Sequence, residues 1–138
     1  MRTRIFDASA IIIVAKNHPD KAQPVLEGEY LLDLTSYEVG NALWKINKLI
    51  DKTDKSMALE AINQASPLLA QMEALKVDGE ELGSVMEVAY ESGLSFYDSS
   101  YLQVARSKGL TLVTEDTNLL SSASKYGVQC LRIRDLAS

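Results

Sequence analysis

Short apolar runs alternate with longer amphipathic segments along the whole chain. In the amphipathic segments, apolar residues recur at three- and four-residue spacing, as on the buried face of a helix. The runs expected as strands are 4–6, 30–34, 75–77, 110–114 and 128–133. Helices are expected at 10–15, 22–27, 36–50, 54–66, 68–72, 80–91, 97–107 and 118–126. This alternation predicts an α/β fold with three layers, α/β/α, around a central, mostly parallel sheet of four to five strands.

Three residues are expected to set helix boundaries. Ser9 is a suitable N-cap for the first helix. Pro67 cannot donate a backbone hydrogen bond, so it should break or kink the helix that begins near residue 54. Gly93 should end the helix that covers residues 80–91.

The size and composition of the chain favour one domain. Its 138 residues suit a single domain over residues 1–138. No apolar run approaches the roughly 20 residues needed to span a bilayer. The lone cysteine, Cys130, excludes an internal disulfide and a cysteine-rich zinc site, and we expect it to be buried. These features predict a cytoplasmic protein with no membrane span.

Four acidic residues lie where predicted strands end or helices begin. Asp7 and Asp116 follow apolar runs, whereas Glu38 and Asp98 fall at helix starts. In an open parallel sheet these positions meet at the edge where ligands bind. Clustered carboxylates repel one another and raise one another's pKa, which is costly without a cation. Because carboxylate oxygens suit hard ions such as Mg²⁺, the four acids predict a divalent metal site.

The overall charge bears on nucleic-acid binding. A protein that binds nucleic acid through phosphate neutralisation alone is usually basic, whereas this chain has a net charge of -5. Two divalent ions would offset the four charges of the cluster, so the acidic balance does not exclude nucleic acid. The basic residues expected to rim the cleft are Arg2, Arg4, Lys16, Lys45, Lys48, Arg106 and Lys108.

Four motifs, in this order, resemble those of the PIN-domain family, and more narrowly the short VapC-type toxins of toxin–antitoxin pairs. They are Asp7-Ala8-Ser9, Glu38-Val39-Gly40-Asn41-Ala42-Leu43, Tyr97-Asp98-Ser99-Ser100-Tyr101-Leu102 and Leu112-Val113-Thr114-Glu115-Asp116-Thr117-Asn118-Leu119. The matching frame covers nearly the whole chain. The resemblance implies a metal-dependent endoribonuclease that cleaves RNA phosphodiester bonds with one or two Mg²⁺ or Mn²⁺ ions.

The resemblance also implies roles for single residues. Asp7 and Asp98 would bind the metal directly, Asp116 directly or through water, and Glu38 would complete the cage or orient the nucleophilic water. The residues expected to support these acids are Ser9 and Thr114, by hydrogen bonds, and Asn41, by a bond to Asp7 or to the loop. Two further acids are expected outside the site, with Glu115 facing solvent and Asp33 facing outward or an edge.

The expected substrate is single-stranded RNA or an RNA loop, because unpaired backbone can bend into a narrow acidic groove. The expected protein partners, from the resemblance, are a second copy of the chain and a cognate antitoxin. The main alternative is a catalytically silent PIN-like module that binds RNA or protein, although the four intact acids argue against it. DNA flap cleavage uses the same chemistry, but this short chain leaves little room for a clamp.

Two other acid-site enzymes fit less well. A haloacid-dehalogenase-type phosphatase requires a second aspartate two residues after the first, where this chain has Ser9. A phosphoryl-receiver domain requires a paired acid after its first strand, which this segment lacks.

Overall fold

A five-stranded, fully parallel sheet forms the centre of the molecule. The structure, a computed structural model, describes residues 3–137. The strands are β1 (Arg4–Phe6), β2 (Tyr30–Leu32), β3 (Glu73–Leu75), β4 (Thr111–Val113) and β5 (Cys130–Leu131), in the order β3-β2-β1-β4-β5. The chain starts at the central strand, and its connections run outward on both sides of β1. The direction of winding therefore reverses between β1 and β4.

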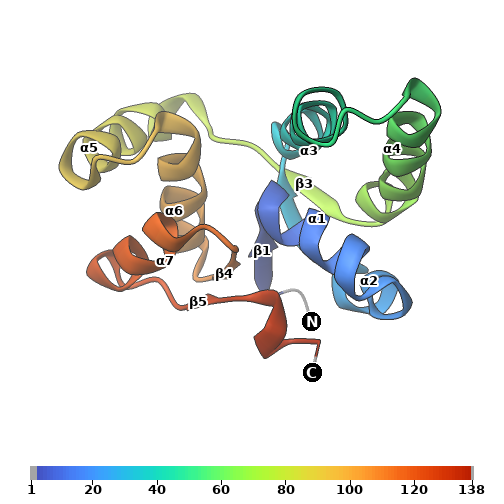
Figure 1. Ribbon diagram of the computed structural model, residues 1–138. Coiled ribbons are helices and arrows are strands. Elements are labelled where there is room, and N and C mark those ends of the chain that lie inside the picture. The colour runs from blue at the N-terminus through green and yellow to red at the C-terminus, as the bar shows by residue number, and fades with distance from the viewer. Residues whose placement is uncertain (1–2, 138) are drawn as a thin grey trace.

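Helices cover both faces of this sheet (Figure 1). On one face lie α1 (Ala8–Asn17), α2 (Pro19–Leu26), α3 (Thr35–Trp44) and α4 (Lys55–Ala70); on the other lie α5 (Leu82–Ser92), α6 (Phe96–Lys108) and α7 (Thr117–Ala123). Successive strand residues enter opposite cores: Phe6 packs with α1–α4, whereas Ile5 packs with α5–α7. The three-layer α/β/α prediction is confirmed.

Burial on both faces explains why β1, β2 and β4 read as apolar runs. Ile5, Phe6, Leu32, Leu112 and Val113 are each 0% exposed. Each such side chain contributes about 1.5–3 kcal/mol when it leaves water. The strands are short, so most of the stabilisation comes from this packing between layers.

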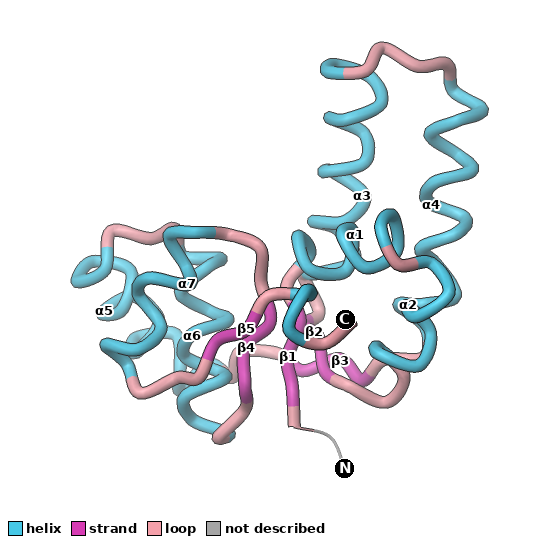
Figure 2. Tube along the Cα trace, turned by 60° about the horizontal axis from the view of Figure 1, so that its bottom comes forward, coloured by secondary structure: helices cyan, strands magenta, loops and turns pink. Residues whose placement is uncertain are grey.

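The helical hairpin of α3 and α4 projects from the body of the molecule (Figure 2). α3 continues into a π-helical segment, η1 (Lys45–Ile50), before the chain turns back into α4. Apolar side chains of this hairpin, among them Leu49, Ile50 and Met57, are at least half exposed. None of the helices in the described part of the chain is long and apolar enough to cross a membrane.

The structure corrects several predicted boundaries. Asp7, not Ser9, caps α1, because its Oδ1 accepts the Ala10 N–H at 3.0 Å. α4 runs through Pro67 without a break. Pro67 lies on the exposed side of the helix, where water can satisfy the carbonyl that lacks an intrahelical donor. Gly93 ends α5 in the left-handed conformation, as predicted.

The structure also changes the bounds of two predicted strands and the predicted burial of Cys130. β3 begins at Glu73, two residues before the predicted run. β5 covers only two residues, because Ile133 starts the short turn η4 (Ile133–Asp135). Cys130 is a free thiol that is half-buried rather than buried, and its partial burial raises its pKa to about 11.

Candidate active site

Asp7 is the first residue after β1, and its buried carboxylate is held by three donors. Oδ1 accepts the Ala10 N–H at 3.0 Å and the Ser9 hydroxyl at 2.7 Å, and Oδ2 accepts the Thr114 hydroxyl. The pKa of Asp7 is raised to about 6, mainly by burial and also by the charge of Asp98, although the three hydrogen bonds lower it. The carboxylate is therefore fixed in orientation, and burial and the charge of Asp98 disfavour its ionised form.

The hydroxyls of Ser9 and Thr114 join the ends of β1 and β4. Besides donating to Asp7, Ser9 Oγ accepts the Glu115 N–H at 3.0 Å, and Thr114 Oγ1 accepts the Asp116 N–H at 3.0 Å. These two neighbouring strands flank the point where the winding direction reverses. Ligands of open α/β sheets bind at this point.

The other three acids all lie at helix N-termini. Asp116 caps α7, its Oδ1 accepting the Leu119 N–H at 3.0 Å. Asp98 stands in the first turn of α6, and Glu38 in the first turn of α3. Helix N-termini carry a partial positive charge that stabilises nearby carboxylates. The fold therefore places each acid where a helix partly offsets its charge.

The four acids influence one another electrostatically. Burial is the main cause that raises the pKa of both Glu38 and Asp98. The charges of Asp7 and Asp98 raise the pKa of Glu38 further, and the charge of Asp116 raises that of Asp98. Asp98 thus interacts with the other three. Within residues 3–137, none of the four forms an ion pair, since the ion pairs there join Arg4 to Glu29 and Arg132 to Glu115.

The donor set suits a hard divalent cation, because it offers only carboxylate oxygens. The mutual repulsion and the lack of a paired cation in the described chain point the same way. The side chains are not preassembled, however. Among residues 3–137 there is no group of three or more His, Cys, Asp or Glu side chains that could hold a metal ion as it stands.

Glu38 has a buried partner that the sequence alone does not reveal. The hydroxyl of Tyr101 donates to Glu38 Oε1 at 2.6 Å and lies 2.6 Å from Thr35 Oγ1. Tyr101 is 0% exposed, and a buried tyrosine usually finds a polar partner for its hydroxyl. Its position one turn after Asp98, among apolar residues of α6, was the available signal.

Two predicted neighbours of the cluster behave differently from expectation. Asn41 is exposed, and its side chain makes no hydrogen bond to Asp7, to the loop or to any other residue of the described chain. Glu115 does not face solvent. Its Oε2 accepts the Ile133 N–H at 2.8 Å and its Oε1 lies 3.7 Å from Arg132 Nη1, so it fastens the C-terminal turn. Asp33 is exposed, as predicted.

Three of the basic residues expected at the cleft lie toward the opposite edge of the sheet. Arg4 begins β1, whereas Asp7 follows its end. Arg106 and Lys108 are in the last turn of α6, whereas Asp98 is in its first turn. The prediction failed because sequence proximity ignored the length of a strand or helix, which carries the chain across the molecule. Lys16, Lys45 and Lys48 are exposed beyond the first turns of α1 and α3, and Arg2 lies outside the described residues.

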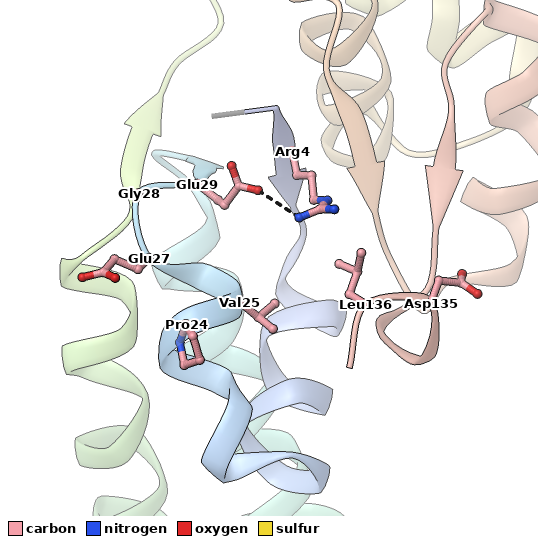
Figure 3. Close-up of a pocket in the computed structure, with 8 residues that line it drawn as sticks. All are labelled: Arg4, Pro24, Val25, Glu27, Gly28, Glu29, Asp135 and Leu136. Atoms are coloured by element: carbon pink, nitrogen blue, oxygen red, sulfur yellow. Dashed lines mark ion pairs between the residues drawn. The ribbon is translucent and has the colours of Figure 1, made fainter. Parts of the chain in front are cut away.

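A cavity of about 780 Å³ lies at the edge where the strands begin (Figure 3). Arg4 and Glu29, which line it, form an ion pair at 3.6 Å, and Leu136 and Val25 contribute apolar surface. A second cavity, of about 550 Å³, lies between α1, α3 and α4. Neither of these two cavities is lined by any of the four acids.

Known proteins resemble this chain over nearly its full length. A family model described as the PIN domain matches residues 4–125. Exonuclease VapC9 of Pyrobaculum aerophilum is 41% identical over 133 residues, which cover 94% of this chain and 93% of the relative. Ribonuclease VapC3 of the same organism is 32% identical over 123 residues, covering 83% and 90%.

A solved structure agrees with these sequence relatives. The crystal structure of PAE2754 from Pyrobaculum aerophilum matches with a TM-score of 0.83 and 35% sequence identity, covering 99% of this chain and 87% of that one. The chain therefore belongs to the PIN-domain family, and its relatives make it a PIN protein of the VapC type.

Proposed function

We propose that this protein is a metal-dependent endoribonuclease and the toxin of a VapBC-type toxin–antitoxin pair. The observation that carries the proposal is the cluster of Asp7, Glu38, Asp98 and Asp116, drawn from four separate elements and left without a paired cation in the described chain. The names of the two relatives, an exonuclease and a ribonuclease, support a nuclease.

The proposed cofactor is Mg²⁺ or Mn²⁺. Asp7, Asp98 and Asp116 would hold it, and Glu38 would complete the cage or orient the attacking water. A bound divalent ion would supply a water of lowered pKa and stabilise the charge that develops on the phosphate. Mg²⁺ keeps several of its waters and needs only one or two direct carboxylates, which suits acids that are near one another without being preassembled.

The chain's own contribution is orientation and charge. Ser9 and Thr114 hold the Asp7 carboxylate from both oxygens. The buried Tyr101 hydroxyl orients Glu38 by donating a hydrogen bond to its Oε1. The side chain of Asn41 makes no hydrogen bond within residues 3–137. Its proposed supporting role is therefore limited to that of an exposed polar group one turn after Glu38. The substrate would be single-stranded RNA or an RNA loop, whose backbone can bend toward a cluster at a sheet edge.

The proposed protein partners are a second copy of the chain and a cognate antitoxin, and the proposed location is the cytoplasm. An exposed apolar stripe on α5 supports a homodimer: Leu82, Met86 and Tyr90 recur every four residues and are each 47% exposed or more. Light scattering would give the mass in solution. Met86→Glu should convert a dimer to a monomer, whereas a wild-type monomer would contradict the dimer.

The alternative is a catalytically silent PIN-like module that binds RNA or protein. One observation favours it, namely that no three metal-binding side chains in the described chain already form a ligand group. The test is cleavage of end-labelled single-stranded and hairpin RNA with Mg²⁺ or Mn²⁺. The wild-type protein and the surface control Glu87→Gln should cleave, whereas EDTA, Asp7→Asn or Asp98→Asn should stop cleavage.

Persistent cleavage by Asp98→Asn would overturn the proposed metal cage. RNA binding without cleavage, under every divalent ion tried, would support the silent module. Expression in a bacterial host adds a second measure, since arrest of growth by the wild type and relief by Asp7→Asn would separate a nuclease from an inert binder.

A further inference from the structure

The side chain of Glu38 is held from the interior of the protein by a chain of three hydrogen bonds. The Leu32 N–H, at the end of β2, donates to Thr35 Oγ1 at 3.1 Å. Thr35 Oγ1 and the Tyr101 hydroxyl are 2.6 Å apart, and Tyr101 donates to Glu38 Oε1 at 2.6 Å. These hydrogen bonds thus connect the backbone of β2, an inner strand of the sheet, to a carboxylate of the acid cluster.

The chemistry of the donors fixes the direction of these bonds when Glu38 is ionised. A carboxylate only accepts, so the single hydroxyl proton of Tyr101 is committed to Glu38. The Tyr101 oxygen must then accept from Thr35, whose own oxygen accepts from the Leu32 N–H. With Glu38 ionised, each hydroxyl proton is thus assigned to one bond, and Tyr101 remains the donor to Glu38.

Burial makes this chain rigid. Tyr101, Thr35 and Leu32 are each 0% exposed, and the Tyr101 ring packs in the core between the sheet and α5–α7. Glu38 itself is only partly buried. One carboxylate oxygen of Glu38 is thereby anchored inside the protein, and Oε2 makes no hydrogen bond with the described residues.

We propose that Tyr101, backed by Thr35, is a positioning residue that aims the free oxygen of Glu38 at the metal and its water. This proposal rests on the proposed nuclease function, because it assigns Glu38 to that site. Tyr101 acts through Glu38 and does not itself touch the substrate. Partners that orient a metal ligand typically contribute 10–100-fold to metal affinity or activity.

The test compares Tyr101→Phe with Tyr126→Phe. Tyr126 also donates its hydroxyl to a glutamate, Glu91, at 3.4 Å, but on the surface and away from the acid cluster. Mn²⁺ affinity of the metal-free protein is measured by calorimetry, cleavage rates are measured against Mn²⁺ concentration, and melting temperature is measured in EDTA. Thr35→Ser, which keeps the hydroxyl, serves as the conservative variant.

Tyr101→Phe should weaken Mn²⁺ binding or lower kcat by about 10–100-fold, with the KM for RNA unchanged. Tyr126→Phe and Thr35→Ser should stay within about threefold of the wild type, because both leave the Glu38 anchor in place. Wild-type Mn²⁺ affinity together with a wild-type kcat in Tyr101→Phe would overturn the proposal while leaving the nuclease function standing. Absence of cleavage by the wild-type protein would contradict the nuclease function alone. A loss of Mn²⁺ affinity in Tyr101→Phe would then still support the positioning role.

Discussion

Thr114 donates a hydrogen bond to Asp7 although 107 residues separate them in sequence. The two side chains lie just past the ends of β4 and β1, the two strands at which the winding of the sheet reverses. Thr114 is 0% exposed and Asp7 is 5% exposed, so neither group can exchange its partner for bulk water. This contact joins the two halves of the sheet at the candidate site.

Replacing Thr114 by valine should destabilise the protein. Valine has nearly the same shape but removes the donor to Asp7 and the acceptor of the Asp116 N–H. We expect the free energy of unfolding in EDTA to fall by about 1–3 kcal/mol, measured by urea denaturation. Thr114→Ser keeps the hydroxyl and should lose less. Equal stability of the two variants would show that the hydrogen bonds do not matter.

The raised pKa of Asp7 predicts how stability depends on pH without metal. The folded-state pKa, about 6, lies above the ordinary value of 3.8, so protonation favours the folded state. This stability is fully present below about pH 4 and is lost as pH rises through 6, amounting to about 2–4 kcal/mol. Asp7→Asn should remove this loss and be the more stable protein at pH 8 in EDTA. Parallel pH curves for the two proteins would contradict the assignment.

Asp116 and Asp54 form a matched pair for testing which acid binds metal. Both cap a helix, accepting the N–H of Leu119 and Met57 respectively. Asparagine caps about as well as aspartate, so Asp116→Asn and Asp54→Asn should each change stability by less than about 1 kcal/mol in EDTA. Only Asp116→Asn should reduce the rise in melting temperature that Mn²⁺ causes. A loss in both variants, or in neither, would rule out a specific role for Asp116.

Glu115 should contribute to the stability of the fold and not to metal binding. It precedes Asp116 in sequence, yet its carboxylate binds the Ile133 N–H and lies near Arg132. Glu115→Ala should lower the free energy of unfolding by about 1–2 kcal/mol, because the Ile133 N–H loses its acceptor. Mn²⁺ affinity should remain at the wild-type value. Glu87→Ala on the exposed side of α5 is the control for loss of an acid alone.

The sequence predicted what depends on local pattern. The run Arg4-Ile5-Phe6 is a strand, and Asp7 follows it, because alternation of apolar runs and helices leaves few other arrangements. The predicted starts of the helices that carry Glu38 and Asp98 lie within one residue of the observed starts for the same reason. Four acids at strand ends and helix starts could therefore be grouped before any geometry was known.

What the sequence did not predict depends on contacts between distant segments. Tyr101 reads as one more core residue of α6, and only the fold shows that its hydroxyl reaches Glu38 from the other side of the sheet. Glu115 reads as a solvent-facing acid until the C-terminal turn folds back onto it. Arg4 reads as a neighbour of Asp7, but three strand residues place it at the opposite edge.

The start of a helix stands beside each of the four acids, with Asp7 and Asp116 capping α1 and α7 and Glu38 and Asp98 in the first turns of α3 and α6. Four backbone termini of partial positive charge thus act as a permanent counter-charge built into the scaffold. These helix N-termini partly offset the repulsion among the four acids, so we expect the protein to fold without a bound metal ion. We expect the metal ion to bind and dissociate reversibly while the protein remains folded. The concentration of divalent cation would then determine the fraction of the protein that is active.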